Sequence, residues 1–356
     1  MTVFLILIVL GLLVITAWQI SKIFQLAKTK KSESYAGVND SRDNRIQGYL
    51  MLTFGILFYG FMIFNFWEYS KLYPPKAASA EGVELDTLFF TTAIVIMLVQ
   101  VLMQALIFYF SYKYHGRKGL VAKFFPDHDK LEFAWTIIPV IVLAILIVYG
   151  LFTWSDIMNV SEEDDDVMVV ELYAYQYGWK ARYAGDDNTL GKANVRFIEG
   201  INSLGVDESD PYSEDDIVVS ELHLPVGQKV LFKMRSQDVI HSAYFPLFRA
   251  QMNVVPGMVT QYAFTPTITT EEMRKRPYML DKVETINTYR KKESEKLAAA
   301  GDEPLDEYEF DYFVLCNKVC GTSHYNMQMK IIVEEQDEFE EWLAEQPTFG
   351  ETMEKS

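Results

Sequence analysis

The stretch FAWTIIPVIVLAILIVYGLFTWS, residues Phe133–Ser155, contains no Asp, Glu, Lys or Arg. About 20 apolar residues in a helix cross the roughly 30 Å hydrocarbon core of a bilayer, so this stretch is long enough to span it. In lipid the backbone must satisfy its own hydrogen bonds, and a helix does so. Three earlier uncharged runs have similar lengths, and they are Met1–Ser21, Ile46–Trp67 and Thr87–Tyr112. The sequence therefore predicts four transmembrane helices, at about residues 2–21, 46–67, 87–112 and 133–155. The alternative is a set of buried helices in a large soluble protein.

The loops between these runs predict the topology. Residues 22–45 contain six Lys and Arg and residues 113–130 contain five, whereas the loop between the second and third runs contains only Lys71 and Lys76. Basic loops remain on the cytoplasmic side, so the chain is expected to begin outside and to return there after the fourth helix. The first run has no preceding basic residue and no small-residue cleavage pattern, which favours a retained helix over a signal peptide. We therefore expect a multi-pass protein of the inner (plasma) membrane whose C-terminal domain lies on the outer, periplasmic face.

The charge is divided unevenly between the two halves of the chain. The total is -17, yet residues 1–154 carry 13 Lys and Arg against 10 Asp and Glu, while residues 155–356 carry 19 against 39. An acidic domain disfavours nucleic-acid binding, which needs clustered Lys and Arg. An aromatic content of 14% argues against disorder, and only two cysteines exclude a scaffold of several disulfides.

The second half reads as a β-rich domain. In Val167–Trp179 the residues Tyr173, Tyr175, Tyr177 and Trp179 alternate, so in one strand they would share a face. Pro-Gly turns separate further runs that predict strands in a sandwich or small barrel, and these are Ile217–His223, Lys229–Met234, Val239–Tyr244, Thr260–Phe264, Asp311–Leu315 and Gln328–Glu334.

The chain is expected to divide into three parts. Residues 1–155 form the anchor, residues 156–345 the outer domain and residues 346–356 a tail. The outer domain carries two insertions, a polar looped one at about 184–215 and a charged one at about 269–300 that contains a helix. Residues Asp337–Glu345 read as a short amphipathic helix.

Both cysteines lie in Cys316–Met327, CNKVCGTSHYNM, which has the pattern C-x3-C-x3-H-x2-M. A structural disulfide is one interpretation, and a zinc site is another, because two Cys and two His form a familiar tetrahedral set. The thioether of Met327 argues against zinc, since this soft ligand suits copper. His241, in Asp238–Ser242, is the candidate for a further metal ligand from a distant part of the chain. A lone His in a strand is, however, more often a packed or exposed side chain than a ligand. His115 and His128 fall on the cytoplasmic side, and His223 lacks this context.

Four blocks of the chain are similar to subunit II of the cytochrome c oxidases, and the resemblance runs from about Phe89 to the C-terminus. The blocks are Leu131–Pro139, Gln176–Trp179, Asp238–Ser242 with Val255–Gly257, and Cys316–Met327. The last block is the most specific. The resemblance implies a membrane anchor followed by an all-β cupredoxin Greek-key barrel that holds the binuclear copper centre CuA.

The resemblance also implies the ligands of both coppers. Two thiolates would bridge the metals, an imidazole and the thioether would complete one copper, and a second imidazole with a backbone carbonyl would complete the other. The bridging thiolates would be those of Cys316 and Cys320. His241 and Met327 would supply the first imidazole and the thioether, and His324 and Lys318 the second imidazole and the backbone carbonyl.

The chain departs from the family at several positions. The family has Glu where this chain has Lys318, and that carboxylate binds a magnesium ion, so the magnesium site is in doubt. Asn253 and Met258 replace an expected Asp and Arg nearby, which adds to this doubt. Tyr177 replaces the Trp that receives electrons in the family, while Trp179 is kept, and the aromatic stripe could equally be core packing. Glu132 matches a carboxylate at the mouth of a proton-uptake pathway, or it is a solvated helix end.

The implied function is that of subunit II of an aa3-type cytochrome c oxidase. The chain would accept electrons from a c-type cytochrome and pass them to haem a in subunit I, where oxygen is reduced and most protons are pumped; the haems belong to the partner only. An acidic surface would steer a basic donor, or merely keep the domain soluble. No Cys-x-x-Cys-His is present, which excludes a fused c-type haem.

The competing hypotheses are a membrane copper-binding protein or chaperone, a quinol oxidase subunit II and a nitrous oxide reductase. A chaperone needs no four-helix anchor, quinol oxidases have lost the copper ligands, and nitrous oxide reductase lacks such an anchor. The expected partners are subunit I, other oxidase subunits and membrane lipid. The first two helices, which are extra, and the long interval from Gly257 to Cys316 are expected to contact partner subunits, as they would in a larger respiratory supercomplex.

Overall fold

The computed structural model describes residues 10–22, 41–70, 75–117, 119–121, 123, 126–164 and 166–355. The chain forms two compact units. One combines Met1–Glu68 with Leu98–His128, and the other combines Tyr69–Met97 with Asp129–Ser356. The long helix α3 contributes to both units.

Among the described residues, three helices are long and apolar enough to cross a membrane. They are α2 (Ser41–Tyr69), α3 (Ala80–Lys113) and α4 (Asp129–Met158). A shorter apolar helix covers Leu10–Lys22, and the rest of the expected first span lies outside the described residues. The second, third and fourth expected spans are thus confirmed as helices of sufficient length and apolarity.

Close packing joins α2 to the second half of α3. A Cβ atom added at Gly55 would lie 2.7 Å from the ring of Phe108, so only glycine permits this approach. The Tyr59 hydroxyl donates to the carbonyl of Val101 at 2.8 Å. Small residues and interhelical hydrogen bonds are the usual means by which helices associate in lipid. The helix that precedes the region of family resemblance is therefore packed against the rest of its unit.

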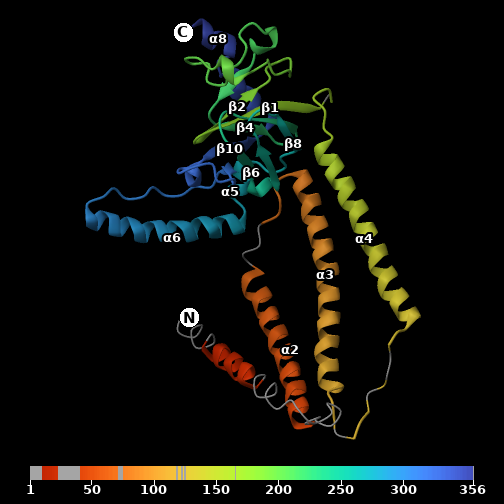
Figure 1. The fold of residues 1–356 in the computed structure, drawn as a ribbon. Helices are drawn as coiled ribbons and strands as arrows, with labels where there is room; N and C mark the ends of the chain where they lie inside the picture. The colour runs from red at the N-terminus through yellow and green to blue at the C-terminus, as the bar shows by residue number, and fades with distance from the viewer. Residues whose placement is uncertain are drawn as a thin grey trace. The chain divides into compact units, whose positions relative to one another are not determined.

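The outer domain contains two five-stranded sheets (Figure 1). The first has the order β3-β2-β1-β5-β8, built from Ile217–Val219, Gly178–Tyr183, Val167–Tyr175, Lys229–Ser236 and Thr260–Phe264. The second has the order β4-β10-β9-β6-β7, built from Leu222–Pro225, Gln328–Glu334, Tyr312–Cys316, His241–Phe245 and Ala250–Val254. The pairs β1–β5 and β4–β10 are parallel, and the other pairs are antiparallel.

An aromatic core fills the space between the sheets. Phe232, Phe245 and Phe264 have mutual ring-centroid distances of 5.1 to 5.3 Å, and Phe248 stacks on Phe264 at 4.8 Å. All four side chains are at most 1% exposed. Burial of such large apolar surfaces is the main stabilising contribution in a domain of this kind. The expected β-rich fold of this domain is therefore confirmed.

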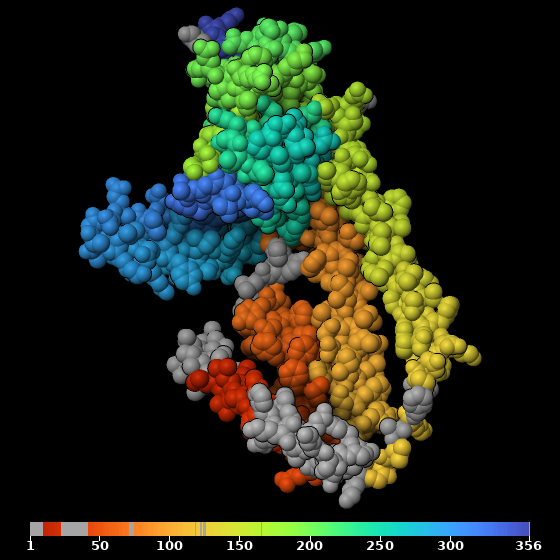
Figure 2. All heavy atoms as spheres, in the orientation of Figure 1, coloured from red at the N-terminus to blue at the C-terminus, as the bar shows by residue number. Residues whose placement is uncertain are grey.

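Four helices lie outside the sheets: α5 (Thr270–Arg274), α6 (Pro277–Ala300), α7 (Gln336–Ala344) and α8 (Phe349–Glu354). The expected helices within 269–300 and 337–345 are confirmed. Figures 1 and 2 show α6 extending away from the sheets. The returning chain covers one side of α6, where the Asn287 amide exchanges two hydrogen bonds with the backbone of Tyr308. Residues 184–215 contain only two short 3-10 turns, Val195–Phe197 and Pro211–Ser213, within otherwise irregular chain.

The expectation that one strand carries the aromatic stripe is wrong. β1 ends at Tyr175, and β2 begins at Gly178 and pairs back on it, with Ala174 opposite Trp179. The Gln176 amide donates at 2.7 Å to the Asp238 carboxylate, which ends the strand and leaves Tyr177 in the turn. Tyr173 is buried with Leu204 and Phe349, whereas Trp179 lies in the main core. The chain therefore turns back between β1 and β2, and the hydrogen bond to Asp238, which is distant in sequence, stabilises this turn.

Other strands also differ from the expectation: β5 extends to Ser236, and β9 is shifted by one residue to Tyr312–Cys316. The run Ile217–His223 is two strands, because β3 pairs with β2 in one sheet and β4 pairs with β10 in the other. The expected strand Val239–Tyr244 begins only at His241, since the Ser236 hydroxyl binds the Val239 carbonyl and holds a turn there. β7 was not expected, because its sequence AQMNV lacks clear alternation. This segment forms a strand because it pairs with β6, and its own composition does not favour a strand.

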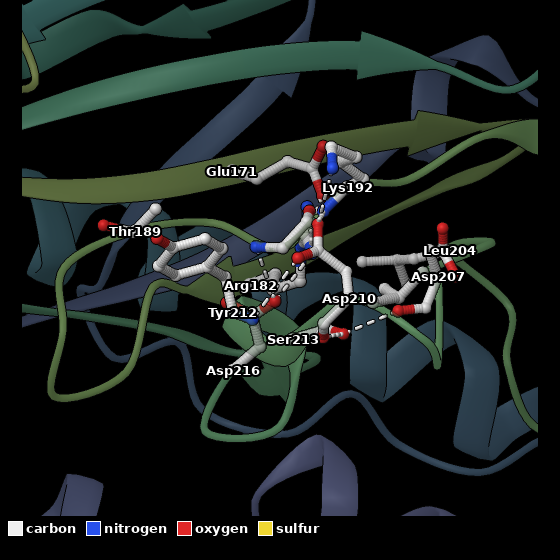
Figure 3. Close-up of polar contacts among 12 residues, drawn as sticks. Glu171, Arg182, Thr189, Lys192, Leu204, Asp207, Asp210, Tyr212, Ser213 and Asp216 are labelled. Atoms are coloured by element: carbon white, nitrogen blue, oxygen red, sulfur yellow. Dashed lines mark hydrogen bonds and ion pairs between the residues drawn. The ribbon is translucent and has the colours of Figure 1, made fainter.

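A buried ionic network ties the 184–215 insertion to the first sheet (Figure 3). The Arg182 guanidinium, 2% exposed, donates to Glu171 at 2.9 Å, to Asp216 at 2.8 Å and to the carbonyl of Gly191 at 2.9 Å. Arg235 also pairs with Glu171. Burial acts to raise the pKa of Glu171, but the two guanidinium groups outweigh it and hold that pKa below its usual range. The insertion is therefore attached to the sheet by charge-assisted bonds.

The raised pKa of Asp216 predicts that the stability of the protein depends on pH. Burial raises its pKa to about 6, although Arg182 and the Gly191 amide act to lower it. A group whose folded pKa exceeds its unfolded pKa of about 3.9 favours folding while it is protonated, and this contribution is lost as the pH rises from about 4 to about 6. Asparagine does not ionise, so we expect the free energy of unfolding of Asp216→Asn not to decrease in this pH range as that of the wild type does. Denaturant titrations of both purified proteins between pH 4 and pH 7 measure the difference, and identical pH profiles would contradict the expectation.

Candidate metal centre

Two adjacent strands of the second sheet bring the candidate metal ligands together. β6 runs antiparallel to β9, with Ala243 opposite Cys316. His241 begins β6 and Cys316 ends β9, so both residues lie at the same end of the sheet. The loop that leaves β9 returns Cys320 to them, and the side-chain ligand atoms of these three residues all lie within 4.8 Å of one another.

All six candidate ligands from the sequence meet in one cluster. The two sulfur atoms of Cys316 and Cys320 are 3.9 Å apart. Cys316 Sγ lies 3.9 Å from His241 Nδ1 and 3.2 Å from the carbonyl oxygen of Lys318. Cys320 Sγ lies 3.7 Å from both His324 Nδ1 and Met327 Sδ. Each cysteine sulfur is therefore flanked by one imidazole and by one further candidate donor.

Backbone hydrogen bonds and one glycine shape the ligand loop. The amide of Cys316 donates to the Met327 carbonyl at 3.0 Å, which closes the loop at its base. Gly321 has a φ of +146°, a conformation that favours glycine. A Cβ atom there would lie 2.3 Å from the Tyr177 hydroxyl oxygen. The loop can therefore pass close to the β1–β2 turn only because residue 321 has no side chain.

The cluster is shielded, whereas the loop around it is exposed. His241 is 0% exposed and Met327 is 2% exposed. Both cysteines are buried and carry free thiols. By contrast, Val319 and Tyr325 on the same loop are 82% and 88% exposed. Two large exposed side chains of the loop therefore lie close in sequence to the buried ligands.

The protonation behaviour of Cys320 fits a site for a soft cation. Burial and the neighbouring Cys316 raise the pKa of the Cys320 thiol to about 11. Two buried thiolates this close repel each other, so the deprotonated pair requires a compensating positive charge. Thiolate, thioether and imidazole ligands together favour copper over hard cations. The residues present therefore fit a copper site.

Asp238 orients His241, a role that the sequence did not reveal. Its carboxylate accepts from His241 Nε2 at 2.8 Å, which leaves Nδ1 directed toward Cys316. Burial acts to raise the pKa of Asp238, but hydrogen bonds from His241, Val239 and Gln176 outweigh it and lower that pKa. A carboxylate that fixes the second nitrogen of a ligating imidazole is common around metals. The position of Asp238 three residues before His241 was the available signal.

The aromatic candidates take different positions. Trp179 is buried, and its ring centroid lies 6.1 Å from that of His241 in an edge-on arrangement. Tyr177 is 36% exposed, and its hydroxyl accepts from the Thr322 amide at 3.2 Å. Gln176 donates to the carbonyl of Cys320. Glu132 lies in the first turn of α4, at the opposite end of that helix from the β domain, and the fold does not bring it to the cluster.

Comparison with known proteins identifies the family. Residues 67–152, which cover α3 and most of α4, match the model of the transmembrane domain of cytochrome c oxidase subunit II. The alternative cytochrome c oxidase subunit 2 of Bradyrhizobium diazoefficiens is 31% identical over 244 residues, which are 68% of this chain and 73% of the relative. The chain belongs to the cytochrome c oxidase subunit II family. Members of this family are subunits of oxidoreductases, and the described helices and sheets agree with the expected membrane anchor followed by a β-rich domain.

Other relatives are more distant. The cytochrome c oxidase subunit 2 of Alkalihalophilus pseudofirmus is 24% identical and aligns with 77% of this chain and 63% of the relative. The periplasmic domain of subunit II of cytochrome oxidase from Bradyrhizobium japonicum is a similar solved structure, with a TM-score of 0.29 and 18% identity over 50% of this chain and 91% of the other. The family match at 67–152 leaves Leu10–Lys22 and nearly all of α2 as additions to the family anchor.

Asp238→Asn is expected to weaken copper binding about 10- to 100-fold, since outer hydrogen-bond partners of metal ligands typically contribute this much. The amide keeps the size of the side chain but loses the charge that holds the His241 tautomer. Competition with a copper chelator measures the affinity. Asn188→Asp, a change between the same two residue types far from the cluster, should leave it unchanged. Equal affinities of wild type and Asp238→Asn would contradict this role.

Proposed function

We propose that this chain is the electron-accepting subunit of an aa3-type cytochrome c oxidase. It takes electrons from a c-type cytochrome at the outer face and passes them to haem a in subunit I, where oxygen is reduced and protons are pumped. The observation that carries the proposal is the cluster in which two cysteine sulfurs 3.9 Å apart are flanked by His241, His324 and Met327.

In this proposal the cluster holds the binuclear copper centre CuA. Cys316, Cys320, His241, His324, Met327 and the Lys318 carbonyl would hold the two coppers, which would supply one-electron chemistry there. The protein holds the donor atoms in place through the closed loop and the Asp238–His241 hydrogen bond, so that little must move when the charge changes.

Tyr177 and Trp179 provide a route from the surface to the cluster. Tyr177 is partly exposed beside the ligand loop, and Trp179 packs beneath it against His241. Tyr177 is therefore the candidate contact for the donor, and Trp179 a candidate conductor or a core residue. Glu132 is proposed to lie at a proton-uptake pathway with subunit I.

The membrane arrangement completes the proposal. Four spans, including the one at residues 2–21, place the β domain on the periplasmic side of the inner membrane, and domain boundaries fall near residues 155 and 345. The acidic outer domain attracts a basic donor over a distance of about a Debye length. The extra helices and insertions contact other oxidase subunits or a larger respiratory assembly.

Electron paramagnetic resonance of the purified oxidase complex tests the function. We expect a mixed-valence signal with one unpaired electron shared over two coppers. A single-copper signal, or a Cys316–Cys320 disulfide without copper, would contradict the assignment and favour a copper-binding protein without an electron-transfer role. Oxidation of a quinol in place of a cytochrome would indicate a quinol oxidase. For Lys318, metal analysis is expected to find no stoichiometric magnesium at this position.

A further inference from the structure

The outer domain is joined to the membrane anchor at a second place besides the connection from α4 to β1. The segment that leads into α3 forms backbone hydrogen bonds with the β domain, from Ala78 N to Leu247 O at 2.7 Å, from Thr267 N to Ala78 O at 2.8 Å and from Ala80 N to Thr265 O at 3.0 Å. Ala78 is 0% exposed. The beginning of α3 is thus built into the domain.

Arg249 makes the strongest polar contact of this attachment. Its guanidinium donates to both carboxylate oxygens of Asp86 on α3, at 2.9 and 3.1 Å. It also donates to the carbonyls of Pro75 and Pro246. The side chains of Arg249 and Asp86 are only 14% and 21% exposed. A bidentate pair shielded to this degree fixes both distance and orientation, which a lysine could not do.

The backbone of Arg249 has an unfavourable conformation. Its φ is +58°, in the left-handed region that residues other than glycine rarely adopt. The residue ends the short turn Pro246–Phe248, which directly follows β6. β6 begins with the candidate ligand His241. Arg249 therefore connects the strand that carries a ligand to a membrane helix, and the strained position is occupied by the one side chain that reaches Asp86.

Two attachments restrict the domain more than one does. At the other attachment, Ile157 of α4 is buried in the main core, and the side chain of Gln261 in β8 donates to Val160 O at 3.4 Å. A domain held only by the α4 connection could rotate about it. A second contact, made by a different helix, removes that freedom.

We propose that Arg249 and Asp86 form a positioning pair that fixes the metal-bearing domain relative to α3, and so sets the distance over which an electron leaves the cluster for the partner subunit. This inference rests on the proposed function. The side-chain hydrogen bonds of Arg249 go to Asp86, Pro75 and Pro246 and involve none of the candidate ligands. The effect of the pair is on the rate of electron transfer out of the centre, because that rate depends steeply on the separation of the two redox groups.

The test uses Arg249→Gly and Asp86→Asn in the complete oxidase complex. Glycine accepts the left-handed backbone, so the first change deletes the side chain without added strain. The rate of haem reduction after rapid reduction of the copper centre is expected to fall about tenfold in each variant, below the roughly 100-fold loss that a misplacement of about 1 Å can cause. The double variant should lose no more than either single one, because both changes remove the same contact. The copper resonance signal should remain that of the wild type.

Asn188→Gly is the matched control. Asn188 is the other described non-glycine residue with a positive φ, at +52°, and its side chain bonds to β1 instead of α3. This variant should leave the rate unchanged. Unchanged rates in Arg249→Gly and Asp86→Asn, additive losses in the double variant, or an altered copper signal would each overturn the positioning role. Failure of the proposed function is distinct, since the wild-type complex would then lack the two-copper signal altogether.

Discussion

Cys320→Ser is expected to abolish the two-copper signal completely. Cys320 Sγ is the centre of the cluster, within 3.9 Å of the Cys316 sulfur and 3.7 Å of both His324 Nδ1 and Met327 Sδ. A serine hydroxyl is a hard, weakly acidic donor and does not replace a bridging thiolate. Electron paramagnetic resonance and copper analysis of the purified protein measure the loss.

The fold should survive this change. Serine is nearly the size of cysteine, and the backbone bonds that close the loop, such as Cys316 N to Met327 O, do not involve the altered side chain. Tyr325→Phe is the matched control in the same loop, because Tyr325 is 88% exposed. Its copper signal should equal that of the wild type. A two-copper signal retained in Cys320→Ser would disprove the ligand assignment.

Arg182→Met is expected to destabilise the outer domain by about 3 to 5 kcal/mol, the usual result of removing one partner from a buried ion pair. Methionine fills part of the space but leaves Glu171 and Asp216 buried without their shared cation, and Gly191 O without its donor. Arg235 remains beside Glu171, so Asp216 suffers the larger loss. The 184–215 insertion should detach first, since Arg182 joins it to the sheet.

Hydrogen exchange of the purified protein, resolved by peptide, measures this effect. Amides of β2 and of the insertion should exchange at least about 100-fold faster, because each 1.4 kcal/mol corresponds to a factor of ten. Arg196→Met removes an equal charge from an exposed position of the same insertion and should have little effect. Comparable exchange in the two variants would show that the buried network contributes no net stability.

Local sequence determined much of this protein. The composition of Phe133–Ser155 alone requires a membrane helix, because lipid excludes almost any other backbone arrangement for such a run. The metal ligands of the loop could also be predicted from the sequence, because Cys316, Cys320, His324 and Met327 lie within twelve residues and metal binding requires them to be close. Strands such as Thr260–Phe264 and Gln328–Glu334 were found at their observed limits because their side chains are β-branched or apolar and turn residues bound them.

Only the tertiary structure decided the features that depend on distant partners. The aromatic run is a hairpin because Gln176 binds Asp238, 62 residues away. Ile217–His223 is two strands because each half pairs with a different sheet. The Arg249–Asp86 pair joins residues 163 positions apart, and no local pattern marks either side chain as paired. A sequence specifies the conformations that a short segment prefers and the chemistry that it carries, whereas register, sheet changes and buried charge pairs arise only when remote segments share the same desolvated space.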